Sequence, residues 1–212
     1  MNRRIISLLL FFAFLVCANA QQKIKVACVG NSITYGSGIK NRDNDSYPAQ
    51  LQQMLGDGYE VVNFGRGGRT GLAHGDRPYI KEPEYKAALE FNPNIVVIKF
   101  GTNDTKPQNW VYRHDFEGDI EAMAKSFENL PSNPKIYLCL PAMAYEIKWG
   151  IRNSVIEEEV IPKIKKVAKK NGWKVINLHK ATANMPEHFP DAIHPDSHAA
   201  GIMAKKVYKA IK

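Results

Sequence analysis

The sequence predicts an α/β domain in which helices cover both faces of a five-stranded parallel sheet. Five short runs of β-branched and aromatic residues recur along the chain, and each is apolar on both faces, as buried parallel strands are. Stretches with helical apolar spacing separate these runs. The chain has 212 residues, which suffices for one compact domain with a sizeable core but is short for two.

The five expected strands occur at regular intervals along the chain. They span residues 24–29, 60–64, 95–100, 136–140 and 175–178. Strands that alternate with helices in this way form an open three-layer α/β/α fold of the flavodoxin-like type. Two segments without periodicity, residues 65–81 and 141–150, follow strands. They therefore lie at the carboxyl edge of the sheet, where such folds bind their ligands.

Four helices are expected from the apolar spacing. The first covers residues 47–55, with Ser46 before it as an N-cap. The clearest pattern steps by three and four residues from Phe116 to Leu130. A similar pattern runs from Ile156 to Val167, with glutamates early and lysines late, as the helix dipole favours. Residues 198–211 form the last helix.

The first twenty residues have the features of a secretory signal peptide. A short basic region precedes an apolar run over residues 5–16, and small residues lead to a cleavage site before Gln21. An apolar run of about a dozen residues is too short to span a bilayer, and a lipoprotein cleavage before Cys17 is disfavoured by the valine that precedes it. We therefore expect a signal peptide at 1–20, one domain at 21–212, and a secreted or periplasmic protein without stable membrane insertion.

Charge and cysteine content argue against several classes of protein. The chain carries 29 Lys and Arg against 21 Asp and Glu, a net charge of +8. Much of the surplus lies in residues 163–174, which have the pattern of a solvated helix face, and no nucleic-acid motif accompanies it. Cys28 and Cys139 lie inside apolar runs, which indicates core thiols rather than a disulfide. Neither G-x-G-x-x-G nor a P-loop is present, so no nucleotide cofactor is expected.

Four polar motifs each follow an expected strand, at the edge where ligands bind. Ser32 follows the first strand and a glycine-rich stretch, residues 63–68, follows the second. Asn103 follows the third strand, and Asp191 and His194 lie between the fifth strand and the last helix. Each motif alone has an ordinary structural explanation as a turn or a helix start. Together they supply a nucleophile, a base, an orienting acid and oxyanion donors, which is what acyl transfer needs.

A metal site is the main alternative for the last motif. Asp191, His194, Asp196 and His198 occur close together in the sequence, but without the H-x-x-x-H spacing of a helical metal site. We therefore expect no metal.

The motifs resemble, in order, the four conserved blocks of the SGNH (GDSL-like) hydrolase family. Gly30-Asn-Ser-Ile-Thr is similar to the first block, residues 63–68 to the second, Gly101–Asp104 to the third and Asp191–His194 to the fourth. The resemblance covers the whole mature chain. It implies an SGNH hydrolase fold and a carboxylic ester hydrolase that uses a serine nucleophile without a cofactor. The absence of G-x-S-x-G argues against the α/β-hydrolase fold.

The resemblance assigns a role to each motif. Ser32 corresponds to the nucleophile, and Asp191 and His194 to the acid and base. The backbone of Ser32, the backbone of Gly68 and the side chain of Asn103 correspond to the oxyanion hole, with Gly65 or Gly67 as alternatives to Gly68. One departure is Asn31, where the family has Asp, a residue thought to support the loop rather than to react.

Substrate is indicated less directly. The stretches FGTNDTKPQNW and AYEIKWGI are similar to the acetylesterase branch, which includes sialate and hemicellulose O-acetylesterases. Trp110 and Trp149 lie in loops where they either stack on a sugar ring or anchor the loop, and Arg66 either attracts a carboxylated sugar or is a solvated cation. We expect an acetylated carbohydrate or another small ester as substrate. The alternatives are a lysophospholipase or thioesterase, and a non-catalytic glycan-binding module.

Overall fold

The computed structural model describes residues 22–212 of the chain. The expected signal peptide, residues 1–20, lies outside the described residues. Five parallel strands form one sheet in the order β2-β1-β3-β4-β5. They are β1 (Ile24–Gly30), β2 (Tyr59–Gly65), β3 (Ile95–Lys99), β4 (Lys135–Leu140) and β5 (Lys174–Asn177). The predicted fold class is confirmed.

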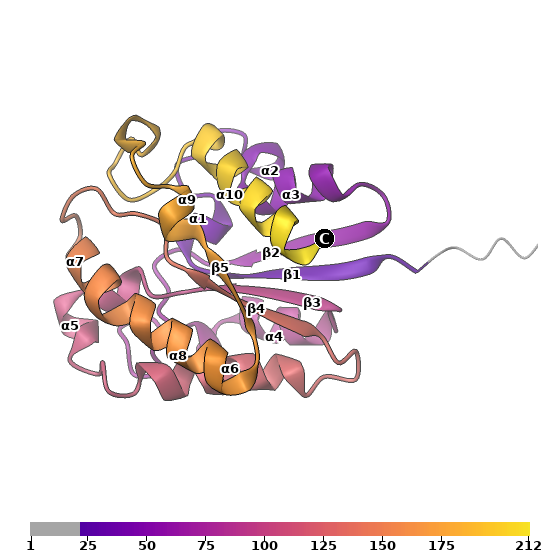
Figure 1. Cartoon of the computed structure of the whole chain (residues 1–212), viewed down its shortest axis with the longest axis horizontal. Helices are drawn as coiled ribbons and strands as arrows, with labels where there is room; N and C mark the ends of the chain where they lie inside the picture. The colour runs from indigo at the N-terminus through magenta and orange to yellow at the C-terminus, as the bar shows by residue number, and fades with distance from the viewer. Residues whose placement is uncertain (1–21) are drawn as a thin grey trace, which may run out of the picture.

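Helices cover both faces of this sheet (Figure 1). One apolar layer packs alternate strand residues against α1 (Ser32–Tyr35), α3 (Tyr47–Leu55), α9 (Leu178–Ala181) and α10 (Ser197–Ile211). The other layer packs the remaining strand residues against α4 (Pro83–Glu90), α6 (Phe116–Glu128) and α8 (Ile161–Asn171). Because both faces of the inner strands are covered, these strands are mostly apolar.

Shorter helical turns lie in the connections. These are α2 (Arg42–Asp45), α5 (Pro107–Trp110), α7 (Asn153–Val155), the 3₁₀ turns η1 (Tyr79–Lys81), η2 (Asn103–Thr105) and η4 (Pro186–His188), and the π-helical turn η3 (Ile156–Val160). Among residues 22–212, no helix combines the length and the apolar character that crossing a bilayer requires.

The helix expected from Ile156 to Val167 contains an irregularity that its apolar spacing does not reveal. The Ile161 N–H donates to the Ile156 carbonyl, which is a π-type bond across five residues. Pro162 follows at once, and proline has no N–H and would collide with the carbonyl four residues earlier in a regular α-helix. The wider turn accommodates this ring and lets the helix continue as α8.

Two strands end one residue earlier than predicted. Leu178 does not extend β5, because the Asn177 side chain accepts a hydrogen bond of 2.8 Å from the Lys180 N–H and so caps α9. Likewise β3 ends at Lys99, before Phe100 and before Gly101 with its φ of 105°.

The strand order determines where a ligand site can form. From β1 the chain moves to β2 on one side, and it then returns to β3 on the other side of β1. The middle strand is therefore β3, but β1 lies at the topological switch point. The carboxyl end of β1, at Gly30, consequently opens into the crevice where open α/β sheets bind ligands.

Candidate active site

Ser32 is the first residue of α1, and a single residue, Asn31, separates it from the end of β1. Asn31 caps this short helix, because its Oδ1 accepts a hydrogen bond of 3.2 Å from the Ile33 N–H. The turn requires Gly30, since a Cβ there would lie 2.2 Å from the Thr34 Oγ1 and 2.8 Å from the Lys99 carbonyl. The hydroxyl of Ser32 is thus held at a sharp, closely packed corner.

Ser32, His194 and Asp191 form a continuous hydrogen-bonded chain. The Ser32 Oγ lies 2.8 Å from the His194 Nε2, and the His194 Nδ1 lies 2.7 Å from the Asp191 Oδ2. A carboxylate can only accept, so the ring proton belongs on Nδ1 and Nε2 is left to accept from the serine hydroxyl. This is the arrangement that a serine nucleophile with a histidine base requires.

The carboxylate of Asp191 is held in its ionised form. Burial opposes ionisation, but hydrogen bonds from the His194 backbone, the His194 ring and the Ile193 backbone outweigh it and keep the pKa of Asp191 below its ordinary value. The backbone bonds to Oδ1 measure 3.0 Å from Ile193 and 2.6 Å from His194. Asp191 therefore both shapes the turn and orients the ring.

The turn between the acid and the base is strained. Ala192 has a φ of 67°, which a residue with a Cβ adopts at a cost of order 1–3 kcal/mol. Its carbonyl accepts from the Tyr145 N–H at 2.8 Å, and its N–H donates to Phe189 at 2.7 Å. Bonds on both sides of Ala192 maintain the conformation that directs His194 toward Ser32.

The four residues weighed as metal ligands separate into two groups. Asp191 bonds to His194, whereas Asp196 accepts from the His188 Nδ1 at 2.9 Å and caps α10 through the Ala199 N–H at 2.9 Å. The ring of His198 stacks on that of His188 with centroids 4.1 Å apart. Within residues 22–212, no three His, Cys, Asp or Glu side chains converge as a metal site.

Besides the backbone of Ser32 at the start of α1, the residues predicted for the oxyanion hole come from two adjoining loops. Gly68 has a φ of 77°, and Asn103 is 4% exposed at the start of η2. The Asn103 Nδ2 donates to the carbonyl of Arg69 at 3.0 Å, which joins the two loops one residue after Gly68. Gly65 has a packing role, because a Cβ there would lie 2.2 Å from the Tyr35 N of α1.

A buried polar network, for which the sequence predicts no role, lies beneath these loops. Asp104 accepts from the Leu72 N–H at 2.8 Å and the Gly101 N–H at 2.9 Å, and so connects the segment that follows the second motif to the third motif. Lys99 is fully buried and donates to the Asn31 Oδ1 at 3.2 Å and the Thr102 Oγ1 at 3.1 Å. The available signal was a lysine inside the otherwise apolar run IVVIKF.

Burial shifts the pKa of both ionisable side chains of this network, Lys99 and Asp104. It lowers the pKa of Lys99 to about 7, although Cys139 and Asp104 partly offset the effect. Burial also raises the pKa of Asp104 to about 6, against the lowering effect of its backbone hydrogen bonds. Near neutral pH, Lys99 is therefore only partly protonated, whereas Asp104 is mostly ionised.

Lys99 should give the protein a distinct pH dependence of stability. Its pKa falls from 10.5 to about 7 on folding, so between these values the unfolded state binds more protons and the free energy of unfolding rises with pH. We expect this rise from pH 7 to 9 in urea titrations of the wild type and a smaller one in Lys99→Met. Lys135→Met, at the exposed start of β4, serves as the control. Equal slopes in all three proteins would contradict the expectation.

One residue expected to contact substrate is unavailable to it. Trp110 is 5% exposed and packs in the core, with its ring 5.5 Å from that of Phe116. Of the two roles left open for Trp110, the burial of its indole favours anchoring the loop over stacking on a sugar.

Trp149 and Arg66 have different environments. Trp149 is 55% exposed, with its ring centroid 5.6 Å from that of His194. Arg66 is ion-paired, with distances of 3.8 Å to Glu82 and 3.1 Å to Glu84. Of the two roles left open for Arg66, these ion pairs disfavour the attraction of an anionic sugar, because two carboxylates already lie beside the guanidinium.

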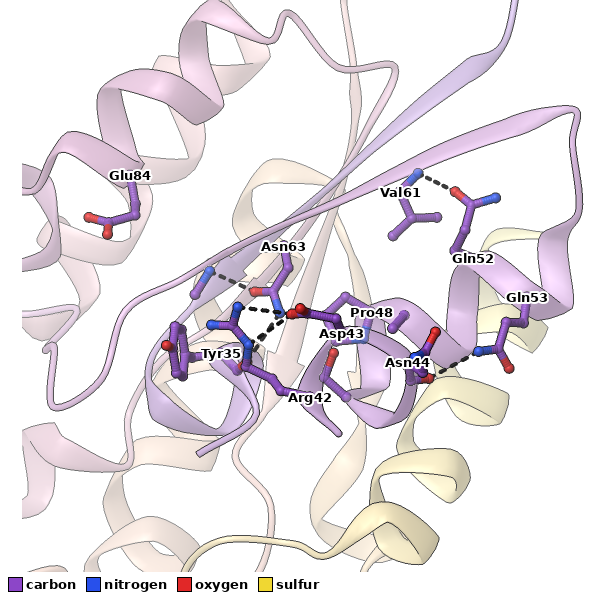
Figure 2. Close-up of a pocket in the computed structure, with 13 residues that line it drawn as sticks. Tyr35, Arg42, Asp43, Asn44, Pro48, Gln52, Gln53, Val61, Asn63 and Glu84 are labelled. Carbon is purple, nitrogen blue, oxygen red and sulfur yellow. Dashed lines mark hydrogen bonds and ion pairs between the residues drawn. The ribbon is translucent and has the colours of Figure 1, made fainter. Parts of the chain in front are cut away.

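A cavity of about 440 Å³ lies away from Ser32, beside the edge strand β2 (Figure 2). Gln52 bonds there to the Val61 N–H at 2.7 Å and the Tyr59 carbonyl at 3.2 Å. Asn63 bonds to the Gly65 N–H at 2.9 Å and the Tyr35 carbonyl at 3.3 Å. These amides cover the free edge of the sheet and are already in use, so the cavity does not compete with the Ser32 site as the functional site.

Comparison with known proteins identifies the family. Residues 28–200 match the GDSL-like lipase/acylhydrolase family, and the chain belongs to it. It is 44% identical over 213 residues to an acetylxylan esterase of Xylanibacter ruminicola. The alignment covers 92% of this chain and 44% of that protein. The chain thus spans about half the length of this curated relative.

Solved structures share the fold. A carbohydrate acetylesterase family member from Sinorhizobium meliloti has a TM-score of 0.72 at 21% identity, over 90% of this chain and 97% of its own. An acetyl xylan esterase has a TM-score of 0.72 at 24% identity, over 89% of this chain and 100% of its own.

Proposed function

We propose that this chain is an exported serine esterase that hydrolyses short-chain esters, chiefly acetyl esters, on carbohydrates. The observation that carries the proposal is the chain of hydrogen bonds, 2.8 Å and 2.7 Å long, from Ser32 through His194 to Asp191. Membership of a lipase and acylhydrolase family supports ester hydrolysis. The relative named acetylxylan esterase supports an acetylated polysaccharide as substrate.

In the proposed reaction, the His194 Nε2 takes the proton of Ser32 while Oγ bonds to the ester carbonyl carbon. Asp191 stabilises the imidazolium, and the oxyanion accepts hydrogen bonds from the Ser32 and Gly68 N–H groups and the Asn103 amide. The bond to the sugar oxygen then breaks, and His194 protonates that departing oxygen, which leaves as a sugar hydroxyl. Water attacks the acetylated serine, gives one proton to His194 and releases acetate, after which the serine recovers its proton.

Two assays distinguish this activity from the alternatives. The first compares kcat/KM for p-nitrophenyl acetate and p-nitrophenyl decanoate, and the second measures acetate release from acetylated xylan, pectin and sialoglycan. We expect the acetate ester to be preferred and at least one glycan to be deacetylated. Preference for the decanoate indicates a lysophospholipase or thioesterase. Absence of hydrolysis and of covalent labelling by a small fluorophosphonate indicates a non-catalytic glycan-binding module.

The proposed export rests on the pattern of residues 1–20. The test is expression of the full chain in a bacterial host, followed by fractionation and N-terminal sequencing. We expect mature protein that begins at Gln21 in the periplasm or medium. Retention of an intact N-terminus in the cytoplasm contradicts the proposal.

The proposed sugar platform is Trp149. Its exposed indole, beside the base, provides a face on which a sugar ring can stack, and its φ of 52° is a strained conformation of the kind found at ligand sites. We expect Trp149→Ala to raise KM for acetylated xylan about 5- to 10-fold and to change kcat/KM for p-nitrophenyl acetate less than about threefold. Ile147→Ala, 78% exposed two residues away, is the control. Equal losses on both substrates contradict stacking.

The proposed oxyanion donor is the amide of Asn103. Such a donor acts mainly on the transition state, so we expect Asn103→Ala to lower kcat for p-nitrophenyl acetate by about 10²–10³-fold with little change in KM. Steady-state kinetics measures both constants. A decrease in kcat below about fivefold removes Asn103 from the proposed site.

A further inference from the structure

Lys99 lies directly beneath the nucleophile loop. It is the last residue of β3, and its side chain is fully buried. Its Nζ donates to the Asn31 Oδ1 at 3.2 Å and to the Thr102 Oγ1 at 3.1 Å. The same Asn31 oxygen accepts from the Ile33 N–H, so two donors from different elements hold one amide.

Stability does not account for a lysine at this position. An ammonium loses its hydration when buried, and an apolar side chain of similar volume is often neutral or better for stability. The nearest buried acid, Asp104, is bonded to the backbone of Leu72 and Gly101, and no ion pair joins it to Lys99 among residues 22–212. The charge of Lys99 therefore contributes little to the stability of the fold.

The amide of Asn31 depends on Lys99 for its orientation. Within the described part of the chain, the Asn31 Nδ2 has no hydrogen-bond partner, so only the oxygen is held. Without Lys99, that oxygen keeps a single bond, of 3.2 Å, to the Ile33 N–H. An amide held at one point can turn about its χ2. Ser32 lies between Asn31 and Ile33 in the sequence, on the same corner.

We propose that Lys99 is a positioning residue for the nucleophile: it fixes the amide of Asn31, which caps α1 and so sets the orientation of the Ser32 hydroxyl toward His194. This inference rests on the proposed function of Ser32. Lys99 does not touch the substrate, and its effect is expected on kcat rather than on KM. A displacement of the hydroxyl by about 1 Å is sufficient to slow acyl transfer about 100-fold.

The test compares kcat, KM and thermal midpoint for the wild type, Lys99→Met and Lys135→Met. Lys99→Met keeps the length of the side chain and removes its donor. We expect its kcat for p-nitrophenyl acetate to fall about 10- to 100-fold, with KM within about twofold. Its thermal midpoint should be unchanged or higher, because a buried charge is removed. Lys135→Met should match the wild type.

A double-mutant cycle with Asn31→Ala tests the route. If Lys99 acts through Asn31, then Lys99→Met has little further effect on kcat in the Asn31→Ala background. If the kcat losses of the two single variants multiply in the double variant, the proposal is overturned. A wild-type kcat in Lys99→Met also overturns it. If Lys99→Met does not fold, Asn31→Asp decides the matter with Lys99 intact. A carboxylate facing the ammonium keeps kcat within about threefold, and a loss above about tenfold overturns the proposal.

The outcomes separate the two proposals. A wild-type protein that neither hydrolyses esters nor reacts with a fluorophosphonate contradicts the proposed function. An active wild type with an unaffected Lys99→Met contradicts the positioning role alone.

Discussion

Replacement of Ser32 by alanine should lower kcat/KM for p-nitrophenyl acetate by at least about 10⁴-fold. The Ser32 Oγ is the atom that lies 2.8 Å from the His194 Nε2, and alanine removes it without adding volume. No other serine hydroxyl among residues 22–212 has a hydrogen bond to His194. Steady-state hydrolysis and labelling by a fluorophosphonate measure the loss directly.

The matched control is Ser37→Ala, five residues later in the same segment. The Ser37 backbone N–H donates to the Ser32 carbonyl at 2.9 Å, and that bond survives the substitution. We expect Ser37→Ala to retain activity within about threefold and Ser32→Ala to retain its circular dichroism spectrum. An active, unlabelled Ser32→Ala protein assigns the hydrolysis to another group and ends the serine esterase interpretation.

Much of the fold was predictable because its signals are local and repeated. All five expected strands exist, with ends shifted by one residue in most cases, because a parallel sheet covered on both faces requires continuous apolar runs. The π turn at η3 was not visible in the spacing. It arises from Pro162, whose effect on the preceding carbonyls depends on the helix continuing through it.

The site was predictable in part, for a related reason. The motifs that contain Ser32 and Asp191 follow strands, and strand order brings them to one edge. Exposure cannot be predicted from spacing in a loop, so Trp110 and Trp149 gave the same signal although one is buried and the other exposed. The position proposed for Lys99 in the site depends on its contacts with Asn31, 68 positions away in the sequence, and with Thr102, 3 positions away. Only the folded chain reveals these contacts.

Replacement of Asp191 by asparagine should lower kcat for p-nitrophenyl acetate by about 10⁴-fold while leaving the fold intact. The Asp191 Oδ1 accepts from the backbone of Ile193 and His194, and an asparagine oxygen can keep both bonds. Its NH₂ group then faces the His194 Nδ1 in place of Oδ2. Two donors cannot share that contact, so the ring proton moves to Nε2.

An imidazole with its proton on Nε2 cannot accept the proton of Ser32, which is why the expected loss is large although the substitution exchanges only one oxygen for an NH₂ group. The matched control is Asp196→Asn, a carboxylate on the same loop that bonds to His188 and caps α10. Because asparagine is as good an N-cap as aspartate, this variant should lose less than about 1 kcal/mol of stability and less than about threefold in kcat. The kcat of both variants reports on the orientation of His194, and their thermal midpoints report on the stability of its loop. Equal kcat losses in the two variants contradict the role of Asp191 in selecting the ring tautomer.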